Sequence, residues 1–155
     1  DAAEKTAPPR EAGLVPEAVF VAATNGDEGA VLLWLAKGGQ VDARCAELHS
    51  TTLLMGASVR GHTPLVRLLL LHKASVDLRA DNKGTALMGA AMQGDPAVVQ
   101  ILLEAGADTS LRDVDGDTAL DYAEFNMREA AARLIRQHAA KPKPPTAEEA
   151  AAAAA

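Results

Sequence analysis

Apolar residues in the middle of this chain come in pairs of short runs, and the two runs of a pair flank a glycine. The clearest pair lies on either side of Gly94, with residues 85–92 before it and residues 98–103 after it. In the second run Val98, Ile101 and Leu102 recur at intervals of three and one, the spacing of one buried helix face. Similar pairs flank Gly26 and Gly61. The pattern therefore predicts short helices arranged in pairs.

The pairs also repeat along the chain at a fixed interval. Thr52, Thr85 and Thr118 lie 33 residues apart, and leucines and alanines keep the same spacing: Leu54, Leu87 and Leu120, then Ala57, Ala90 and Ala123. Self-similarity at about 33 residues is typical of the ankyrin repeat. Residues 16–138 resemble that family, which implies an all-α solenoid of stacked helix-turn-helix units joined by hairpin-like loops. The phase predicts four repeats, at about 16–44, 45–79, 80–112 and 113–138.

The resemblance implies a structural role for each recurring residue type. Each threonine is expected to cap the first helix of its repeat, and such a cap stabilises the helix by about 1 kcal/mol. Glycines between the helices (Gly26, Gly61, Gly94) and after the second helices (Gly38, Gly106) are expected to adopt positive φ. His62 is expected to brace a turn by hydrogen bonds. Met127 and Lys73 replace two of the glycines, and two extra residues lie near residues 45–50.

Composition narrows the function classes. Only four residues are aromatic, so leucine, valine and alanine must build the core of the 155-residue chain. The net charge of −6 argues against nucleic acid or an anionic membrane as the main partner. No run approaches the roughly 20 apolar residues of a membrane helix. The single Cys45 permits no internal disulfide and favours a reducing compartment, the cytoplasm or an organelle stroma or matrix.

The two ends differ from the repeats. Residues 1–15 contain prolines and charges without a sustained period, which predicts an extended arm or linker. Residues 139–155 contain Lys141-Pro-Lys-Pro-Pro145, which favours an extended segment. The six final alanines either form a helix or stand for residues of undetermined identity.

No combination of residues predicts catalysis, a cofactor or a metal site. Cys45 and His49 lack a third ligand for zinc. We expect Cys45 to be an ordinary surface cysteine, and the alternative is a reactive thiol. Asp113, Asp115 and Asp117 alternate as in a calcium loop but lack its bidentate glutamate. The glycines are not followed by the Lys-Ser/Thr of a phosphate-binding loop. We therefore expect a protein that is not an enzyme.

Three arginines occupy the same phase in the loops between repeats. Arg44, Arg79 and Arg112 are separated by 35 and 33 residues, as the insertion requires. Each could pair with a nearby acid (Glu47, Asp81 or Asp113), which is worth about 0–1 kcal/mol at a surface. Alternatively, the three could form a column that binds carboxylates or carbonyl groups of a partner.

The remaining candidates come from the family's usual binding surface, the concave side made by the loops and the exposed side of the first helices. They are Asn82, Asp115 and Asp117 at loop tips, and Arg60, Met92, Gln93 and Phe125 near helix ends. Met92 and Phe125 would be exposed anchors, although the C-terminal segment could instead cover Phe125. We expect a soluble module that binds a protein partner. The alternative is a peripheral subunit of a larger complex. The abundant alanine and glycine are similar to ankyrin arrays of GC-rich algal genomes, which would imply an organellar, photosynthetic complex.

Overall fold

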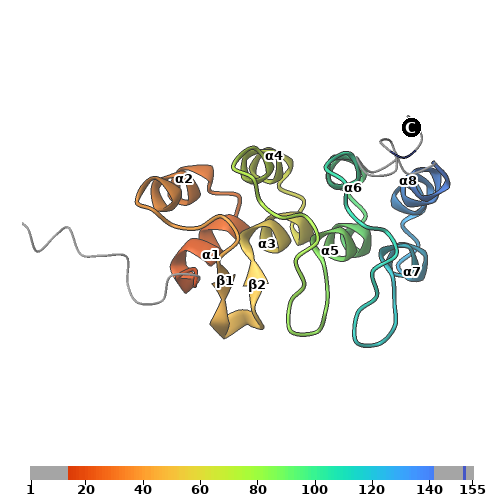
Figure 1. Ribbon diagram of the computed structural model, residues 1–155, viewed down its shortest axis with the longest axis horizontal. Helices are drawn as coiled ribbons and strands as arrows, with labels where there is room; N and C mark the ends of the chain where they lie inside the picture. The colour runs from red at the N-terminus through yellow and green to blue at the C-terminus, as the bar shows by residue number, and fades with distance from the viewer. Residues whose placement is uncertain (1–13, 142–151, 153–155) are drawn as a thin grey trace, which may run out of the picture.

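The structure, a computed structural model, describes residues 14–141 and Ala152. Within residues 14–141 the helices form four pairs, each with a turn between its two members. The pairs are α1 (Glu17–Thr24) with α2 (Glu28–Ala36), α3 (Leu53–Val59) with α4 (Thr63–Leu71), α5 (Ala86–Gln93) with α6 (Pro96–Glu104), and α7 (Ala119–Phe125) with α8 (Glu129–Ala140). The pairs stack in chain order, with α1, α3, α5 and α7 (the inner helices) in one layer and α2, α4, α6 and α8 (the outer helices) in the other (Figure 1). This arrangement confirms the predicted all-α solenoid.

The threonines begin the inner helices as expected. The hydroxyl oxygens of Thr52, Thr85 and Thr118 each accept a hydrogen bond from the backbone N–H three residues on, at 3.3 Å. This bond satisfies one of the N–H groups that a helix start leaves without an intrahelical partner. In α7 the carboxylate of Asp121 also accepts a bond from the Thr118 N–H at 2.8 Å, so the capping is reciprocal.

The turns between inner and outer helices require a left-handed residue. Gly26, Gly61 and Gly94 have φ of 77°, 73° and 84°, and Met127 adopts φ 56° at the equivalent position. A residue other than glycine also occupies the turn after α4, where Lys73 has φ 68°. Only glycine adopts this conformation without a steric penalty, so the turns at Met127 and Lys73 carry strain.

The turns also connect neighbouring repeats. His62 Nε2 lies 2.8 Å from the carbonyl oxygen of Thr24, which confirms the expected bracing role. The ring of His62 lies directly over Gly26, where an added Cβ would come within 2.7 Å of Nδ1. The next repeats place Asp95 over Gly61 and Arg128 over Gly94 in the same way.

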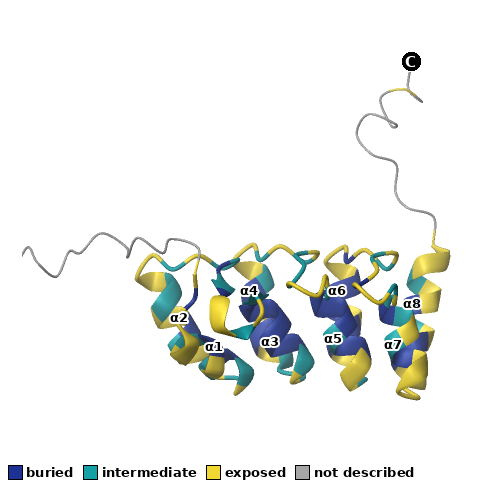
Figure 2. Ribbon diagram, turned by 90° about the horizontal axis from the view of Figure 1, so that it is seen from below, coloured by how far each residue is buried: buried dark blue, intermediate teal, exposed yellow. Residues whose placement is uncertain are grey.

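The core lies between the two helix layers and between successive pairs (Figure 2). Ala57, Ala90 and Ala123 are fully buried where one inner helix faces the next. Small side chains at this phase allow the inner helices to approach closely, while leucines fill the space toward the outer helices. The largest fully buried side chains include Leu54, Leu65, Leu69, Leu87, Leu102 and Ile135.

Three loops connect the pairs and project from the same side of the stack (Figure 1). The first contains β1 (Arg44–Cys45) and β2 (Thr51–Thr52), which pair antiparallel around a short 3-10 turn, η2 (Ala46–Leu48). The two extra residues of this loop accompany the 3-10 turn. Cys45 is fully buried, so the expectation of a surface cysteine is wrong. Successive side chains of a strand point to opposite faces, so in β1 Cys45 is buried in the core while Arg44 is only partly buried.

The ends of the stack differ in polarity. The outer face of α8 carries exposed Arg133, Arg136 and Gln137, with Arg136 paired to Glu124. The first pair instead leaves Val21 and Leu33 exposed by 43% and 57%. The predicted arm at residues 1–15 lies outside the described residues except for Leu14 and Val15. Of the predicted tail at residues 139–155, only residues 139–141 and Ala152 are described. The boundaries of both stay predictions.

Candidate functional site: the groove and the loops

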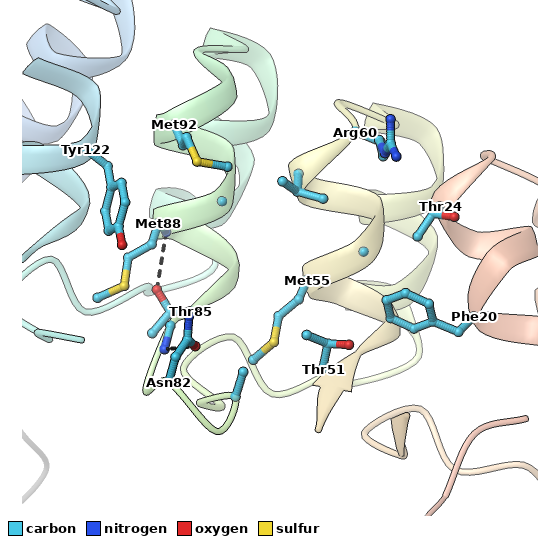
Figure 3. Close-up of a pocket in the computed structure, with 15 residues that line it drawn as sticks. Phe20, Thr24, Thr51, Met55, Arg60, Asn82, Thr85, Met88, Met92 and Tyr122 are labelled. Carbon is cyan, nitrogen blue, oxygen red and sulfur yellow. Dashed lines mark hydrogen bonds between the residues drawn. The ribbon is translucent and has the colours of Figure 1, made fainter. Parts of the chain in front are cut away.

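A groove of about 360 Å³ crosses the inner helices beside the loops. Its wall is mainly apolar, and its side chains come from α1, α3, α5 and α7 and from the loops between them (Figure 3). The side chains that define it are Phe20, Met55, Val59, Met88, Met92 and Tyr122, with Thr24, Thr51, Arg60, Asn82 and Thr85 at its edges.

Two glycines account for the depth of the groove. Gly56 and Gly89 occupy the middle of α3 and α5 at the same phase, and both line the groove. An added Cβ on Gly56 would lie 3.1 Å from the ring of Phe20, and one on Gly89 would lie 3.4 Å from Val59 Cβ. At these positions glycine allows neighbouring inner helices to approach closely along the wall of the groove.

Methionines supply most of the groove's adaptable surface. Met55 and Met88 lie one repeat apart and are largely buried, whereas Met92, one turn further along α5, is 40% exposed. Unbranched thioether side chains can repack around differently shaped ligands. Met92 is among the residues that the sequence predicted. Phe20, Met55, Met88 and Tyr122 were missed, although the 33-residue phase that located Met92 also relates Met55 to Met88.

The three phase-related arginines form a continuous hydrogen-bonded series, which we call the arginine ladder. The guanidinium of Arg44 donates to the carbonyl oxygen of Ser50 at 3.0 Å and to that of Arg79 at 2.6 Å. Arg79 donates in turn to the carbonyl oxygens of Lys83 and Arg112. Arg112 donates to the carbonyl oxygen of Gly116 at 2.7 Å. The arginines therefore bind backbone carbonyls, and none pairs with the acids that were considered from sequence.

The third loop is held by a buried carboxylate. Asp113 is 7% exposed and accepts hydrogen bonds from the N–H groups of Asp115 and Asp117 and from the hydroxyl of Tyr122. The Tyr122 hydroxyl, followed by these backbone donors, holds the pKa of Asp113 below its usual value. The bond to Asp113 correspondingly raises the pKa of Tyr122 to about 12. Asp113, the first of the three alternating aspartates that resemble a calcium loop, thus has a structural role in bracing this loop.

The remaining predicted residues are divided between two places. Arg60, Asn82 and Met92 meet at the groove. Asp117 and Phe125 meet instead at a smaller hollow beside the last inner helix, with Phe125 89% exposed. The hollow and the groove share Tyr122, so they are neighbouring parts of one surface. Gln93 and Asp115 are exposed but line neither depression.

The groove and the loops offer apolar surface, hydrogen-bonding groups and charged side chains. Across residues 14–141 no three His, Cys, Asp or Glu side chains gather where they could hold a metal ion. Burial, together with Glu47, raises the pKa of the Cys45 thiol, which disfavours the nucleophilic thiolate. In the same part of the chain no helix is long and apolar enough to cross a membrane.

Comparison with known proteins agrees with the architecture. A family profile described as ankyrin repeats (3 copies) matches residues 19–113 and 76–145. Human ankyrin repeat domain-containing protein 29 is 45% identical over 62 residues, which is 40% of this chain. The zebrafish (Danio rerio) protein of the same name is 42% identical over 64 residues, or 41% of the chain. The matched segments span only 20% and 21% of those two relatives.

Proposed function

Because the chain belongs to the ankyrin-repeat family, a family of protein-interaction modules that is typically non-catalytic, we propose that it binds a protein segment in the groove along its inner helices. The carrying observation is the apolar groove between α1 and α7, which has two glycines in its floor and Met92 at its rim.

Three features support the groove as the binding surface. It is continuous across all four helix pairs, since Phe20 lies in the first and Tyr122 in the last. It adjoins the exposed Phe125, so an apolar segment could extend beyond the groove itself. Exposed aromatic and methionine side chains next to a well-formed depression are typical binding anchors.

The loops contribute in a different way from the one expected. Because the carbonyl bonds of the arginine ladder occupy much of the donor capacity of Arg44 and Arg79, these two residues chiefly hold the loops in register. Arg60 and Asn82 are exposed at the groove's edge and remain candidates for polar contacts with the bound segment.

The test compares two exposed apolar residues on opposite sides of the stack. Met92→Glu places a charge in the groove, whereas the control Leu71→Glu changes a leucine that is 80% exposed on the outer helix α4. Partners are first identified by cross-linking mass spectrometry on the native source. Binding of the identified partner is then measured for both variants.

We expect Met92→Glu to weaken binding at least about tenfold, because a charge in an apolar contact lacks a partner, while Leu71→Glu binds normally. Equal binding by both variants would exclude the groove. Size-exclusion chromatography of the native material addresses the alternative role. Migration with a large assembly would support a peripheral subunit of an organellar complex, and migration as a free monomer would not.

A further inference from the structure

The loops are linked by two hydrogen bonds that recur at each step of the stack. One is the arginine ladder, in which Arg44 and Arg79 each donate to a carbonyl of their own loop and to the carbonyl of the next arginine. The other runs the opposite way. The N–H of Asp81 donates to the carbonyl oxygen of His49, and the N–H of Val114 donates to that of Asn82, both at 3.0 Å.

The third loop carries the carbonyl acceptor and the guanidinium donor that would be needed to bind one more loop. Asp115 occupies the phase of His49 and Asn82, and no residue of the described segment donates to its carbonyl oxygen. Arg112 occupies the phase of Arg44 and Arg79, and its guanidinium has only the Gly116 carbonyl as a hydrogen-bond acceptor within residues 14–141. One open acceptor and one open donor therefore lie at the same edge, three residues apart along the chain as Arg79 and Asn82 are in the second loop.

The chain does not supply the next loop within its described part. In the first three repeats the outer helix stops before a left-handed residue (Gly38, Lys73 or Gly106), from which the chain returns toward the loops. At the equivalent position, residue 139, α8 is still helical and continues to Ala140. Within residues 14–141, therefore, no further loop covers the edge at Arg112 and Asp115 as the earlier loops are covered.

We propose that this edge binds an extended, basic segment of another protein, which adds one more step to the series of loops. The N–H of the segment donates to the Asp115 carbonyl, and one of its carbonyl oxygens accepts from the Arg112 guanidinium, as in the addition of a strand to a sheet edge. The side chains of Asp115 and Asp117 are exposed there. These acids favour lysine or arginine in the segment and disfavour a carboxylate as the group bound by Arg112.

This binding mode does not depend on occupation of the groove. It uses the Asp115 carbonyl and the Arg112 guanidinium of the third loop, whereas the groove binds through the side chains of the inner helices. The two sites therefore respond to different substitutions, and either can fail without the other.

The probe is a short capped peptide that alternates valine and lysine, titrated into the isotope-labelled chain and followed by NMR. Its control has the same charge but carries N-methyl groups on alternate amides, so that one edge cannot donate. We expect amide shifts at residues 112–117 and at the Arg112 side chain. We expect the methylated peptide to bind about tenfold more weakly, because it loses the hydrogen bond to the Asp115 carbonyl.

Variants locate the contact. Arg112→Lys keeps the charge but loses the planar fork, and should weaken the unmethylated peptide, whereas Arg67→Lys on α4 should not. The spectrum of unbound Arg112→Lys reports whether the third loop is retained. The comparison of the two peptides uses the unmodified chain and so does not depend on that variant.

Three results would overturn the proposal. Equal affinity of the two peptides would mean that only charge is recognised, and absence of any shift would mean that the edge does not bind. Shifts at Met88 and Met92 in place of residues 112–117 would put the peptide in the groove, supporting the proposed function while rejecting this edge. Retention of the 112–117 shifts in Met92→Glu would support the edge as a separate site.

Discussion

The strained turn at Met127 predicts that a single substitution to glycine will stabilise the chain. Met127 has φ 56° where the three earlier turns have glycine at 77°, 73° and 84°. A residue with a Cβ loses about 1–2 kcal/mol in this conformation. Glycine in turn costs about 0.4–1 kcal/mol through the greater freedom of the unfolded chain.

The side chain of Met127 contributes little to offset this gain. It is 91% exposed, so its removal costs almost no buried apolar area. We therefore expect Met127→Gly to raise the free energy of unfolding by about 0.5–1 kcal/mol, the difference between the strain and the entropy. For a chain of this size that corresponds to an increase in Tm of about 1–4 °C.

Urea unfolding followed by circular dichroism measures the change. Because a repeat array can lose its last pair before the rest, fluorescence of Trp34 in α2 should be recorded in parallel as a report on the first pair. Met127→Ala is the matched control, since it removes the side chain but keeps the Cβ, and we expect it to change stability by less than about 0.5 kcal/mol. Equal stabilisation by alanine and glycine would refute strain as the cause.

Three further predictions follow from other contacts. The only tyrosine, Tyr122, should ionise with a pKa of about 12 in the folded chain and at a lower pH in Asp113→Asn, because the hydrogen bond to Asp113 is the largest cause of the raised pKa. Because the pKa of Tyr122 is raised in the folded state, the bond to Asp113 stabilises the folded state fully below pH 10. This contribution to the free energy of unfolding is lost as the pH rises toward 12. An absorbance titration with the same midpoint in both proteins would contradict the contact. Gly56→Val should destabilise by about 1–3 kcal/mol, because its Cβ would crowd the Phe20 ring, and an unchanged urea midpoint would argue against that packing. The buried Cys45 should react with a thiol reagent only as the chain unfolds, so rapid labelling of the folded protein would be inconsistent with its burial.

Local features of this fold were predictable from sequence because they depend on residues close together in the chain. A threonine at a helix start caps the backbone N–H three residues further on, whatever the rest of the fold. A glycine between two helices likewise permits the positive φ that the turn requires. The role of His62 followed from the family resemblance and is confirmed by its bond to Thr24.

Features that depend on contacts between repeats were harder to predict. The phase aligned Arg44, Arg79 and Arg112 correctly, but their acceptors are carbonyl oxygens, which carry no sequence signal. The burial of Cys45 depends on the pairing of β1 with β2, which no local pattern specifies. Gly56 and Gly89 were visible at the same phase, yet their effect on the groove needs the position of the neighbouring helix.

The arginine ladder gives the array a direction. Arg44 and Arg79 each depend on a carbonyl supplied by the following loop, so shortening the protein from its C-terminal end leaves a guanidinium with an acceptor missing. Shortening it from the N-terminal end frees the Arg79 carbonyl oxygen and also leaves the N–H of Asp81 without its His49 acceptor. Either cut therefore breaks both series of bonds at one step, so dissection of the protein into minimal folding units should keep neighbouring loops together.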